Sequence, residues 1–503
     1  MPEKVIIIGA GITGLSTGCY LQMNGFETEI HEMHSLPGGL CTSWKREGYT
    51  IDGCIHWLVG SRPGNSLYDA WNELVNMKEI NFYNHEIYYL AEDDKGNCIR
   101  FYNNIDKLEK ELLSKAPEDK AVIMDYITSA RKFSRMKMPL GKPMELFTIA
   151  DAFEALVKMG PYFGRLRKWS KVSIVDFAAR FKNPFLRKTM ENLFVPEMGV
   201  VFAMITTAWM NNNMAGYPIG GSLEFSRLIE QRYLELGGKI HYNSRIKEIA
   251  TTESGGKTSA IGIVTASGET FNAACVVSAA DGHSTLFELL GGRYIDPKTA
   301  DFYNTQLTFP SFLLLSLGVD RIIESESSSL IFPLTKPVYI DPSTTITDFN
   351  IRIHSYDPTL APEGKTLLEA MIPTRETDYW CNLRNNDLKE YKAEKERIIR
   401  EVTAGMEWRL GNIDAHLEMK DLSTPASVVR YTNNWKGSFE GWIMTPKIGF
   451  SQLPMKFPGL NNFYMAGHWV NPGGGLPVAL MTGRGVAGLI CRQSGKKFRT
   501  VHF

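Results

Sequence analysis

Two glycine-rich turns lie near opposite ends of this 503-residue chain. The first, IIIGAGITGLSTG, contains Gly9, Gly11 and Gly14. In a turn of this spacing the first glycine permits the tight bend after a strand, the second lets the backbone approach a pyrophosphate, and the third lets the following helix pack closely. The N-terminus of that helix attracts an anion through its free N–H groups and its dipole. The first turn therefore predicts a dinucleotide-binding site.

An acidic residue follows where a dinucleotide site requires one. Glu32 ends an alternating segment, ETEIHE, that predicts a strand. A carboxylate at this place accepts hydrogen bonds from the ribose diol of a dinucleotide. The pattern alone is compatible with both NAD and FAD.

The second turn lies within FYMAGHWVNPGGGLPVALMTGR, residues 463–484. A strand-like run ends at Gly467, a proline and three glycines follow at 472–475, and a helix-like segment begins there. A glycine turn between a strand and a helix brings backbone N–H groups against something flat or anionic. This second turn therefore predicts a second contact with a bound group.

The elements that must position both turns can be predicted from hydrophobic periodicity. An apolar run at 4–8, a helical segment at 13–24 and the strand at 27–32 form a βαβ unit with a buried parallel strand. The segment 216–249 predicts a turn, a helix, a Gly-Gly stop and a strand. The last block, 420–503, returns to strand, glycine turn and helix, so nucleotide-binding character occurs in three separated blocks.

The segment HSLPGGLCTSWKREGYTIDGCIHW, which follows Glu32, resembles a known superfamily. Its Gly38-Gly39 pair after the ribose acid, together with the C-terminal glycine turn, is similar to the FAD-dependent amine-oxidase and phytoene-desaturase superfamily. NPGGGLPVALMTGR resembles the HPGAGIPG…SGR turn of bacterial phytoene desaturases, and TPASVVRYTNNWKGSFEGW at 424–442 resembles the segment that precedes it. IDGCIHW at 51–57 resembles the FDTGIHY of retinol saturases. The chain is identified as a member of the carotenoid desaturase, carotenoid isomerase and retinol saturase family.

The resemblance implies FAD as the cofactor, with both glycine turns serving one extended molecule. It implies that the first turn holds the pyrophosphate, that Glu32 holds the adenosine ribose, and that Ile246 offers backbone groups to the adenine. It places the second turn beside the ribityl chain and the isoalloxazine. The implied cofactor-binding residues are Gly9, Gly11, Ile12, Thr13, Gly14, Glu32, Gly39, Leu40, Ile246, Gly467, His468, Gly474, Gly475 and Leu476.

The family pattern also supplies candidates for chemistry and two departures. Many relatives have an acid where this chain has His468, and Cys54 stands where retinol saturases have glycine. His56 is the candidate catalytic residue, because its loop is aligned beside the flavin and its pKa range suits proton exchange; the alternative is a histidine hydrogen-bonded in the core or to the cofactor. Trp57 lines the substrate channel or packs in the core. No ligand pairs have the spacing of a metal site, so we expect no metal.

The expected fold class is α/β: a Rossmann-type FAD-binding domain of the two-dinucleotide-binding-domain flavoproteins, an inserted α+β substrate domain, and a helical, membrane-facing insertion. We expect the FAD-binding domain at 1–75, 215–300 and 420–503, the substrate-binding domain at 76–104 and 301–419, and the helical insertion at 105–214.

The segment 155–173, ALVKMGPYFGRLRKWSKVS, interleaves basic and aromatic residues and contains no acid. Basic residues attract anionic headgroups and aromatic residues favour the interface, which predicts a peripheral membrane contact. Family members that take hydrocarbons from bilayers use a helical segment at about this place. The alternative is a solvated basic helix that packs its aromatic stripe on the core. Pro161 and the two nearby glycines argue against one continuous helix.

The composition bounds the remaining possibilities. Lys and Arg number 55, as do Asp and Glu, which argues against a nucleic-acid partner. Seven cysteines without a CxxC indicate reduced thiols and a cytoplasmic location. The chain starts directly with a strand, so we expect no signal peptide, and no apolar run is long enough to span a bilayer.

The expected function is that of an FAD-dependent oxidoreductase acting on a lipophilic, unsaturated, carotenoid- or retinoid-like substrate by hydride transfer at flavin N5. Desaturation, double-bond saturation and cis–trans isomerisation stay open, as does the identity of the electron acceptor or donor. One alternative is an amine or protoporphyrinogen oxidase-type flavoenzyme, and another is a non-catalytic FAD-binding escort protein.

Overall fold

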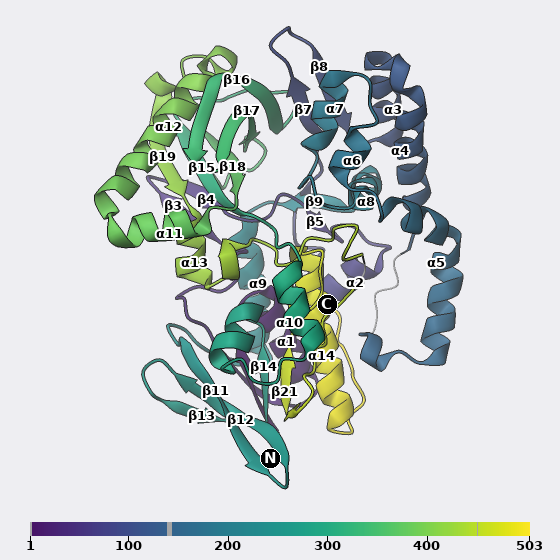
Figure 1. The fold of residues 1–503 in the computed structure, drawn as a ribbon, viewed down its shortest axis with the longest axis vertical. Coiled ribbons are helices and arrows are strands. Elements are labelled where there is room, and N and C mark those ends of the chain that lie inside the picture. Colours follow the sequence, from purple (N-terminus) through teal and green to yellow (C-terminus); the bar gives the residue numbers. More distant parts are fainter. Residues whose placement is uncertain (1–2, 138–142, 450) are drawn as a thin grey trace.

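A computed structural model describes residues 3–137, 143–449 and 451–503 of the chain (Figure 1). At its centre is a five-stranded parallel sheet with the order β10-β2-β1-β14-β21. The two of its strands that come first in the sequence, and the helix between them, match the predicted βαβ unit. The strands are β1 (Lys4–Ile8), β2 (Glu27–His31), β10 (Lys239–His241), β14 (Cys275–Ser278) and β21 (Phe463–Met465).

Three helices that lie far apart in the sequence pack together beside this sheet: α1 (Ile12–Met23), α9 (Gly221–Glu235) and α14 (Gly475–Gln493). A Cβ on Gly483 would lie 2.4 Å from Ser16 Oγ, so α14 sits directly on α1. Gly18 lets α1 approach α9, because a Cβ on this glycine would lie 2.5 Å from the Tyr233 ring. The C-terminal helix is thereby fixed against the N-terminal one.

A small antiparallel sheet covers the other face of the central sheet. It consists of β11 (Ile246–Ser254), β12 (Lys257–Thr265) and β13 (Thr270–Asn272), with β20 (Leu460–Asn461) paired to β12. Phe271 of β13 packs edge-on against the ring of His31 in β2, with ring centroids 4.6 Å apart.

A second large sheet has seven strands in the order β19-β15-β18-β17-β16-β7-β8. It joins two stretches that are more than two hundred residues apart, and α11 (Thr377–Asn386) and α12 (Leu388–Leu410) lie against it (Figure 1). Its strands are β7 (Ile87–Glu92), β8 (Cys98–Tyr102), β15 (Ser311–Val319), β16 (Ser329–Asp341), β17 (Thr344–Ile353), β18 (Thr366–Thr374) and β19 (Leu417–Ser423).

The region between β8 and β9 is helical, as its composition predicts, and it has its own core around Tyr126 and Trp169. Its helices are α3 (Ile105–Lys115), α4 (Lys120–Phe133), α5 (Ile149–Trp169), α6 (Ile174–Ala178), α7 (Pro184–Glu191) and α8 (Val200–Asn211). Contrary to the expectation from Pro161, α5 is one helix that continues through this proline. A capping box between Thr148 and Asp151 stabilises its start, and water can satisfy the carbonyl that the proline leaves free.

Short elements connect these bodies. Strands β5 (Leu58–Val59) and β6 (Phe82–Tyr83) pair with β9 (Ala215–Pro218), and β3 (Ser43–Arg46) pairs with β4 (Tyr49–Asp52). Three short helices also lie between these bodies in the sequence: α2 (Ser66–Asn72), α10 (Pro297–Thr305) and α13 (Pro425–Thr432). Among the described residues, no helix has the length and apolar character to cross a bilayer.

Candidate active site

One cavity of about 1540 Å³ receives both glycine turns and extends between the central sheet, the helical region and the seven-stranded sheet. Every residue that the sequence predicts for the cofactor lines it, except Gly14, and His56 and Trp57 line it as well. Gly14 instead lies inside the turn, where an added Cβ would stand 1.9 Å from the carbonyl oxygen of Gly9. The role of Gly14 is therefore close packing of α1 on the strand that precedes it.

The two turns are neighbours in space although more than four hundred residues separate them. A Cβ on Gly467 would lie 3.4 Å from Thr13 Oγ1 in the first turn of α1. The N–H of Gly467 donates to Thr482 Oγ1 at 2.9 Å, which ties the end of β21 to α14. The Gly38 N–H donates to the Ala10 carbonyl at 2.8 Å, so the Gly-Gly segment joins the same cluster of loops.

The N-terminus of α1 is open to an anion. No side chain caps the helix at Gly11, and its first turn contains no acidic residue. The N–H groups of Ile12, Thr13 and Gly14 therefore have no intrahelical acceptor. Because Gly11 and Ile12 line the cavity, an anionic group bound there meets free donors and the positive end of the helix dipole.

Glu32 borders the cavity just beyond β2 and is only 6% exposed. One of its oxygens accepts the Ala10 N–H at 2.7 Å and the other accepts the His34 N–H at 2.8 Å. Burial raises the pKa of this carboxyl, and the backbone donors partly oppose that rise. Each oxygen keeps a second lone pair, which is what hydrogen bonding to a ribose diol requires.

The loop that carries His56 is anchored by buried hydrogen bonds at its start. Asp52 accepts the Tyr217 hydroxyl at 2.8 Å and the Ser222 N–H at 3.1 Å. Ser222 Oγ in turn accepts the Ile55 N–H at 2.8 Å. These bonds hold the 53–56 segment against the N-terminus of α9.

His56 faces the cavity with no hydrogen bond to its ring from the described residues. Burial, together with the positive charges of Arg352 and His354, lowers the pKa of His56 well below its usual range. The imidazole is therefore neutral at physiological pH, so that it can accept a proton or a hydrogen bond but does not store a proton. This state fits a base or a cofactor contact better than a general acid.

Sequence reasoning did not single out Glu440, an acidic residue that lines the cavity. An added Cβ on Gly474 would lie 2.5 Å from Glu440 Oε2, so the carboxyl stands against the second glycine turn. No described residue forms a hydrogen bond with this carboxyl, and burial raises its pKa to about 8. The only sequence signal was the resemblance of 424–442 to the family segment, which did not single out Glu440.

His468 and Trp57 lie on two sides of the cavity. Burial lowers the pKa of His468, which a hydrogen bond to the Glu440 backbone partly offsets. The Trp57 ring lies edge-on to Tyr88 and Phe194, at centroid distances of 5.5 and 6.1 Å. Trp57 thus belongs to an aromatic wall that the cavity shares with the helical region.

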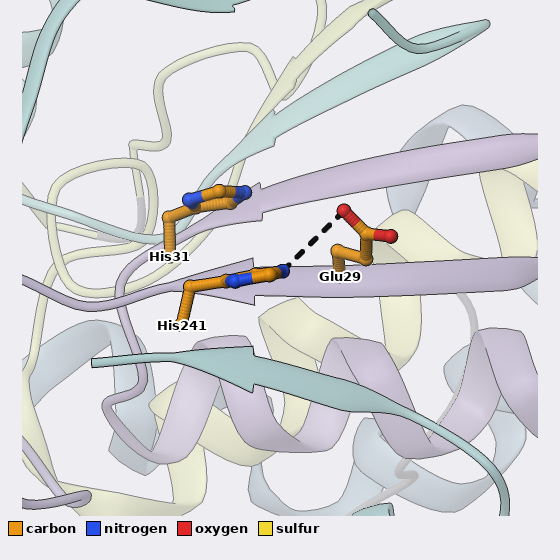
Figure 2. Close-up of side chains that lie close together, drawn as sticks. All are labelled: Glu29, His31 and His241. Atoms are coloured by element: carbon orange, nitrogen blue, oxygen red, sulfur yellow. Dashed lines mark ion pairs between the residues drawn. The ribbon is translucent and has the colours of Figure 1, made fainter. Parts of the chain in front are cut away.

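A separate cluster of potential metal ligands, Glu29, His31 and His241, lies on the edge strand β10 and its neighbour β2 (Figure 2). Lys4 Nζ is 2.9 Å from Glu29 and already compensates its charge. The two imidazole rings are stacked at 4.5 Å with an interplanar angle of 16°, so their lone pairs run side by side instead of meeting at one point. Burial lowers the pKa of His31 to about 4. The geometry favours an ion pair over a metal site here.

The chain belongs to the family of flavin-containing amine oxidoreductases, whose profile matches residues 12–491. Among curated proteins it resembles the chloroplastic prolycopene isomerase of Arabidopsis thaliana, at 22% identity over 95% of this chain and 81% of that protein. It also resembles a 4,4'-diapophytoene desaturase of Methylomonas sp, at 23% identity over 99% of this chain and 97% of that protein. The family confirms that the protein is a flavin-dependent oxidoreductase.

Solved structures confirm the fold class. An oxidoreductase from Methanosarcina mazei superposes with a TM-score of 0.58 at 17% identity, covering 96% of this chain and 99% of that one. A putrescine oxidase bound to putrescine superposes with a TM-score of 0.60 at 12% identity, covering 98% and 99%. At these identities the likeness shows the amine-oxidase-like, mixed α/β flavoprotein fold alone.

The cofactor is FAD, and the residues of the cavity fit this molecule. The uncapped N-terminus of α1 suits the pyrophosphate, and Glu32, beside it, suits the ribose. At the far end, α14 begins at Gly475, its N-cap residue Gly474 provides no side-chain cap, and its first turn contains no acid, so it presents further free N–H groups. The two glycine turns, which together form a clamp for the cofactor, thus offer hydrogen-bond donors at both ends, as an extended dinucleotide requires.

Proposed function

We propose that this protein oxidises, reduces or isomerises a lipophilic, unsaturated, polyene-like substrate with the help of its FAD. The single observation that carries the proposal is the continuity of the cavity, which runs from the glycine turns into a mainly apolar and aromatic chamber. A cavity of about 1540 Å³ exceeds the size of ordinary small-molecule pockets, roughly 300–1,000 Å³. It therefore has room for an extended substrate beside the cofactor.

The apolar lining of the chamber comes from two bodies of the protein. Both bodies supply aromatic side chains, and the seven-stranded sheet adds a branched and a sulfur-containing one. The main contributors are Tyr88, Phe194, Phe202, Trp209, Phe309, Phe312, Ile331, Phe349 and Met371. Such a wall gains free energy from burying hydrocarbon, at roughly 25 cal/mol per Å², and excludes water from the reacting carbons.

The chemistry divides between the cofactor and a few residues. Bound FAD supplies the hydride acceptor or donor. His56, neutral in the cavity, accepts a proton or orients a polar substrate end, whereas Glu440 retains its proton at neutral pH and serves as a donor. The apolar wall fixes the direction of the substrate, so that these two groups act at a defined carbon.

The exposed face of α5 supports access from a membrane. Its side chains Phe153, Leu156, Val157 and Phe163 are between 60% and 68% exposed and recur at helical spacing. Phe147, just before α5, lines the cavity and is also 45% exposed. The cavity thus reaches the surface beside an apolar helix face, a suitable arrangement for taking up a hydrocarbon from a bilayer.

Parts of the predicted basic and aromatic stripe of α5 do pack inward. Trp169 is fully buried and donates to Ser129 Oγ at 2.9 Å, while Tyr162 donates to the Arg135 carbonyl at 2.8 Å. The proposed membrane face is therefore the opposite, apolar side of the helix. Two of the basic residues of α5, Lys158 and Lys168, form ion pairs with Glu154 and Asp125.

Vesicle binding tests the proposed membrane contact. We expect the wild-type protein to sediment with vesicles that contain anionic lipid, and the double variant Phe153→Glu and Leu156→Glu to stay in the supernatant. The matched control is Leu388→Glu, at a 52% exposed leucine on α12, which should sediment like the wild type. Equal sedimentation of the α5 variant and the control would refute the contact.

Anaerobic assays with classes of substrate test the function. The protein with its bound flavin is offered polyenes, retinoids, unsaturated fatty acids and amines, and flavin absorbance is followed. Reduction or reoxidation of the flavin by a polyene or retinoid supports the proposal. Reduction by an amine favours the amine oxidase alternative, and a flavin that responds to none of these substrates favours the escort alternative.

A further inference from the structure

Two cysteines, Cys41 and Cys54, face each other at the end of a β-ladder beside the cofactor turns. The antiparallel pair β3 and β4 has Ser43 opposite Asp52, and the Gly53 N–H donates to the Thr42 carbonyl at 3.0 Å. Cys41 and Cys54 lie just beyond β3 and β4, on either side of this hydrogen bond, and their thiols are joined by a hydrogen bond. The Thr42 N–H donates to the Leu40 carbonyl at 2.9 Å, so the backbone turns at Cys41 and the ladder ends there.

This position suits a disulfide. Two thiols that are joined by a hydrogen bond need only small side-chain rotations to reach the geometry of an S–S bond. The Cys41 thiol is in addition held by a contact of 3.5 Å to the Ser222 carbonyl, on the residue whose hydroxyl binds the Ile55 N–H next to Cys54.

The two thiols interact with each other beside the cavity. Cys41 is 2% exposed, and Cys54 faces the cavity. A hydrogen bond that the Cys54 thiol donates to Cys41, together with burial and the charges of Asp52 and Glu440, keeps the pKa of the Cys54 thiol well above its usual range. Because the thiolate and not the thiol reacts with electrophilic reagents, Cys54 is a poor target for reagents from outside.

Both cysteines lie in the loops that hold the cofactor. Cys41 directly follows Gly39 and Leu40, and both thiol-bearing residues line the same cavity as Gly474 and Gly475. Glu440, whose carboxyl stands against the second glycine turn, lines this cavity as well. The dithiol therefore borders the flavin end of the clamp.

We propose that Cys41 and Cys54 form a reversible dithiol–disulfide pair that exchanges two electrons with the bound flavin. In the oxidising direction both S–H bonds break and one S–S bond forms. The thiols release two electrons and two protons; the electrons and one proton reduce the oxidised flavin, and the second proton leaves to solvent. In the reverse direction the disulfide accepts two electrons from reduced flavin and becomes the dithiol.

This pair would act as an internal electron store for the redox partner that the sequence leaves open. The proposal rests on the flavin of the proposed function but not on its substrate. It agrees with a chain of seven cysteines without a disulfide framework, because disulfides in reducing compartments are typically transient and catalytic.

An anaerobic reductive titration of air-equilibrated protein with bound flavin tests the proposal. With dithionite and no organic substrate, the wild type should consume four electrons per flavin, two for the flavin and two for the disulfide. Cys54→Ser and Cys41→Ser should each consume two. The control Cys381→Ser, at a cysteine on α11 outside the cavity, should consume four.

Peptide mapping of the wild type supplies a readout that needs no variant. Under non-reducing conditions, a Cys41–Cys54 cross-linked peptide should be present in air and should disappear after photoreduction of the flavin. A wild-type titration that ends at two electrons, or peptides without this cross-link, would overturn the proposal. Because no substrate is present, a failed substrate screen leaves this result intact, and the reverse also holds.

Discussion

The buried carboxyl of Glu440 gives the protein a stability that depends on pH in a predictable direction. Burial raises its pKa from 4.5 to about 8, and no described residue donates a hydrogen bond to it. Replacement by glutamine, Glu440→Gln, keeps the shape of the side chain and removes the titration. The difference in stability between this variant and the wild type therefore isolates the carboxyl.

The sign follows from proton linkage. Between pH 4.5 and about 8 the folded protein keeps a proton that the unfolded chain has lost, so the stability of the wild type falls as pH rises through this window. At about 1.4 kcal/mol per pH unit the full effect is about 5 kcal/mol. One side of the carboxyl faces the cavity, where water solvates the charge. We therefore expect about half of this stability difference, roughly 2–3 kcal/mol.

Thermal melting of the flavin-loaded protein between pH 5 and pH 9 measures this effect. In a chain of this size 1 kcal/mol corresponds to a shift in Tm of about 1 °C. The Tm of Glu440→Gln should thus gain roughly 2–3 °C on the wild type between pH 5 and pH 9. Glu248→Gln, at an exposed glutamate on β11, serves as the control. Melting curves of wild type and Glu440→Gln that stay parallel over the whole range would refute the buried, unpaired state of this carboxyl.

Three further predictions concern the first glycine turn, the cavity residue His56 and the C-terminal helix α14. Gly14→Ala places a Cβ 1.9 Å from the Gly9 carbonyl oxygen and should cost about 1–3 kcal/mol and most of the bound flavin, read as the ratio of flavin to protein absorbance; full retention of flavin would contradict it. His56→Gln should change the rate without removing any ionisation between pH 6 and 8 from the rate profile, because the pKa of His56 lies below that range; loss of such an ionisation would contradict this. Arg484→Leu strands buried Glu73, which Arg484 Nε contacts at 2.9 Å, and should cost about 3–5 kcal/mol in chemical denaturation; Arg492→Leu on the same helix should cost far less.

The nucleotide-binding elements could be predicted because their signals are local. The apolar run 4–8, the glycine spacing and the alternating 27–32 segment each determine a short element, and the structure has β1, α1 and β2 there. The C-terminal turn was equally readable, since Gly467 and the 472–475 run must precede a helix. Local chemistry and backbone freedom suffice for such features.

The missed features depend on contacts between distant segments. Glu440 becomes important only because its loop lies against Gly474, and Cys41 and Cys54 meet only because the chain folds back between β3 and β4. Neither has a characteristic spacing in the chain. The Glu29, His31 and His241 cluster likewise needs β10 to pair with β2, more than two hundred residues away in sequence.

The continuity of α5 through Pro161 shows the limit of a local rule. A proline inside a helix removes one hydrogen bond, and we expected it to break the segment. Tyr162, Leu166 and Trp169 instead pack α5 against the helical core, and this tertiary packing outweighs the local cost.

An experimental structure of the protein with its native cofactor tests the central claim most directly. It should show one FAD with its pyrophosphate at the N-terminus of α1, its ribose at Glu32, and its ring system between the Gly39–Leu40 segment and the Gly474–Leu476 turn. A nicotinamide in place of the ring system, or a flavin ring that lies away from the C-terminal glycine turn, would contradict the account.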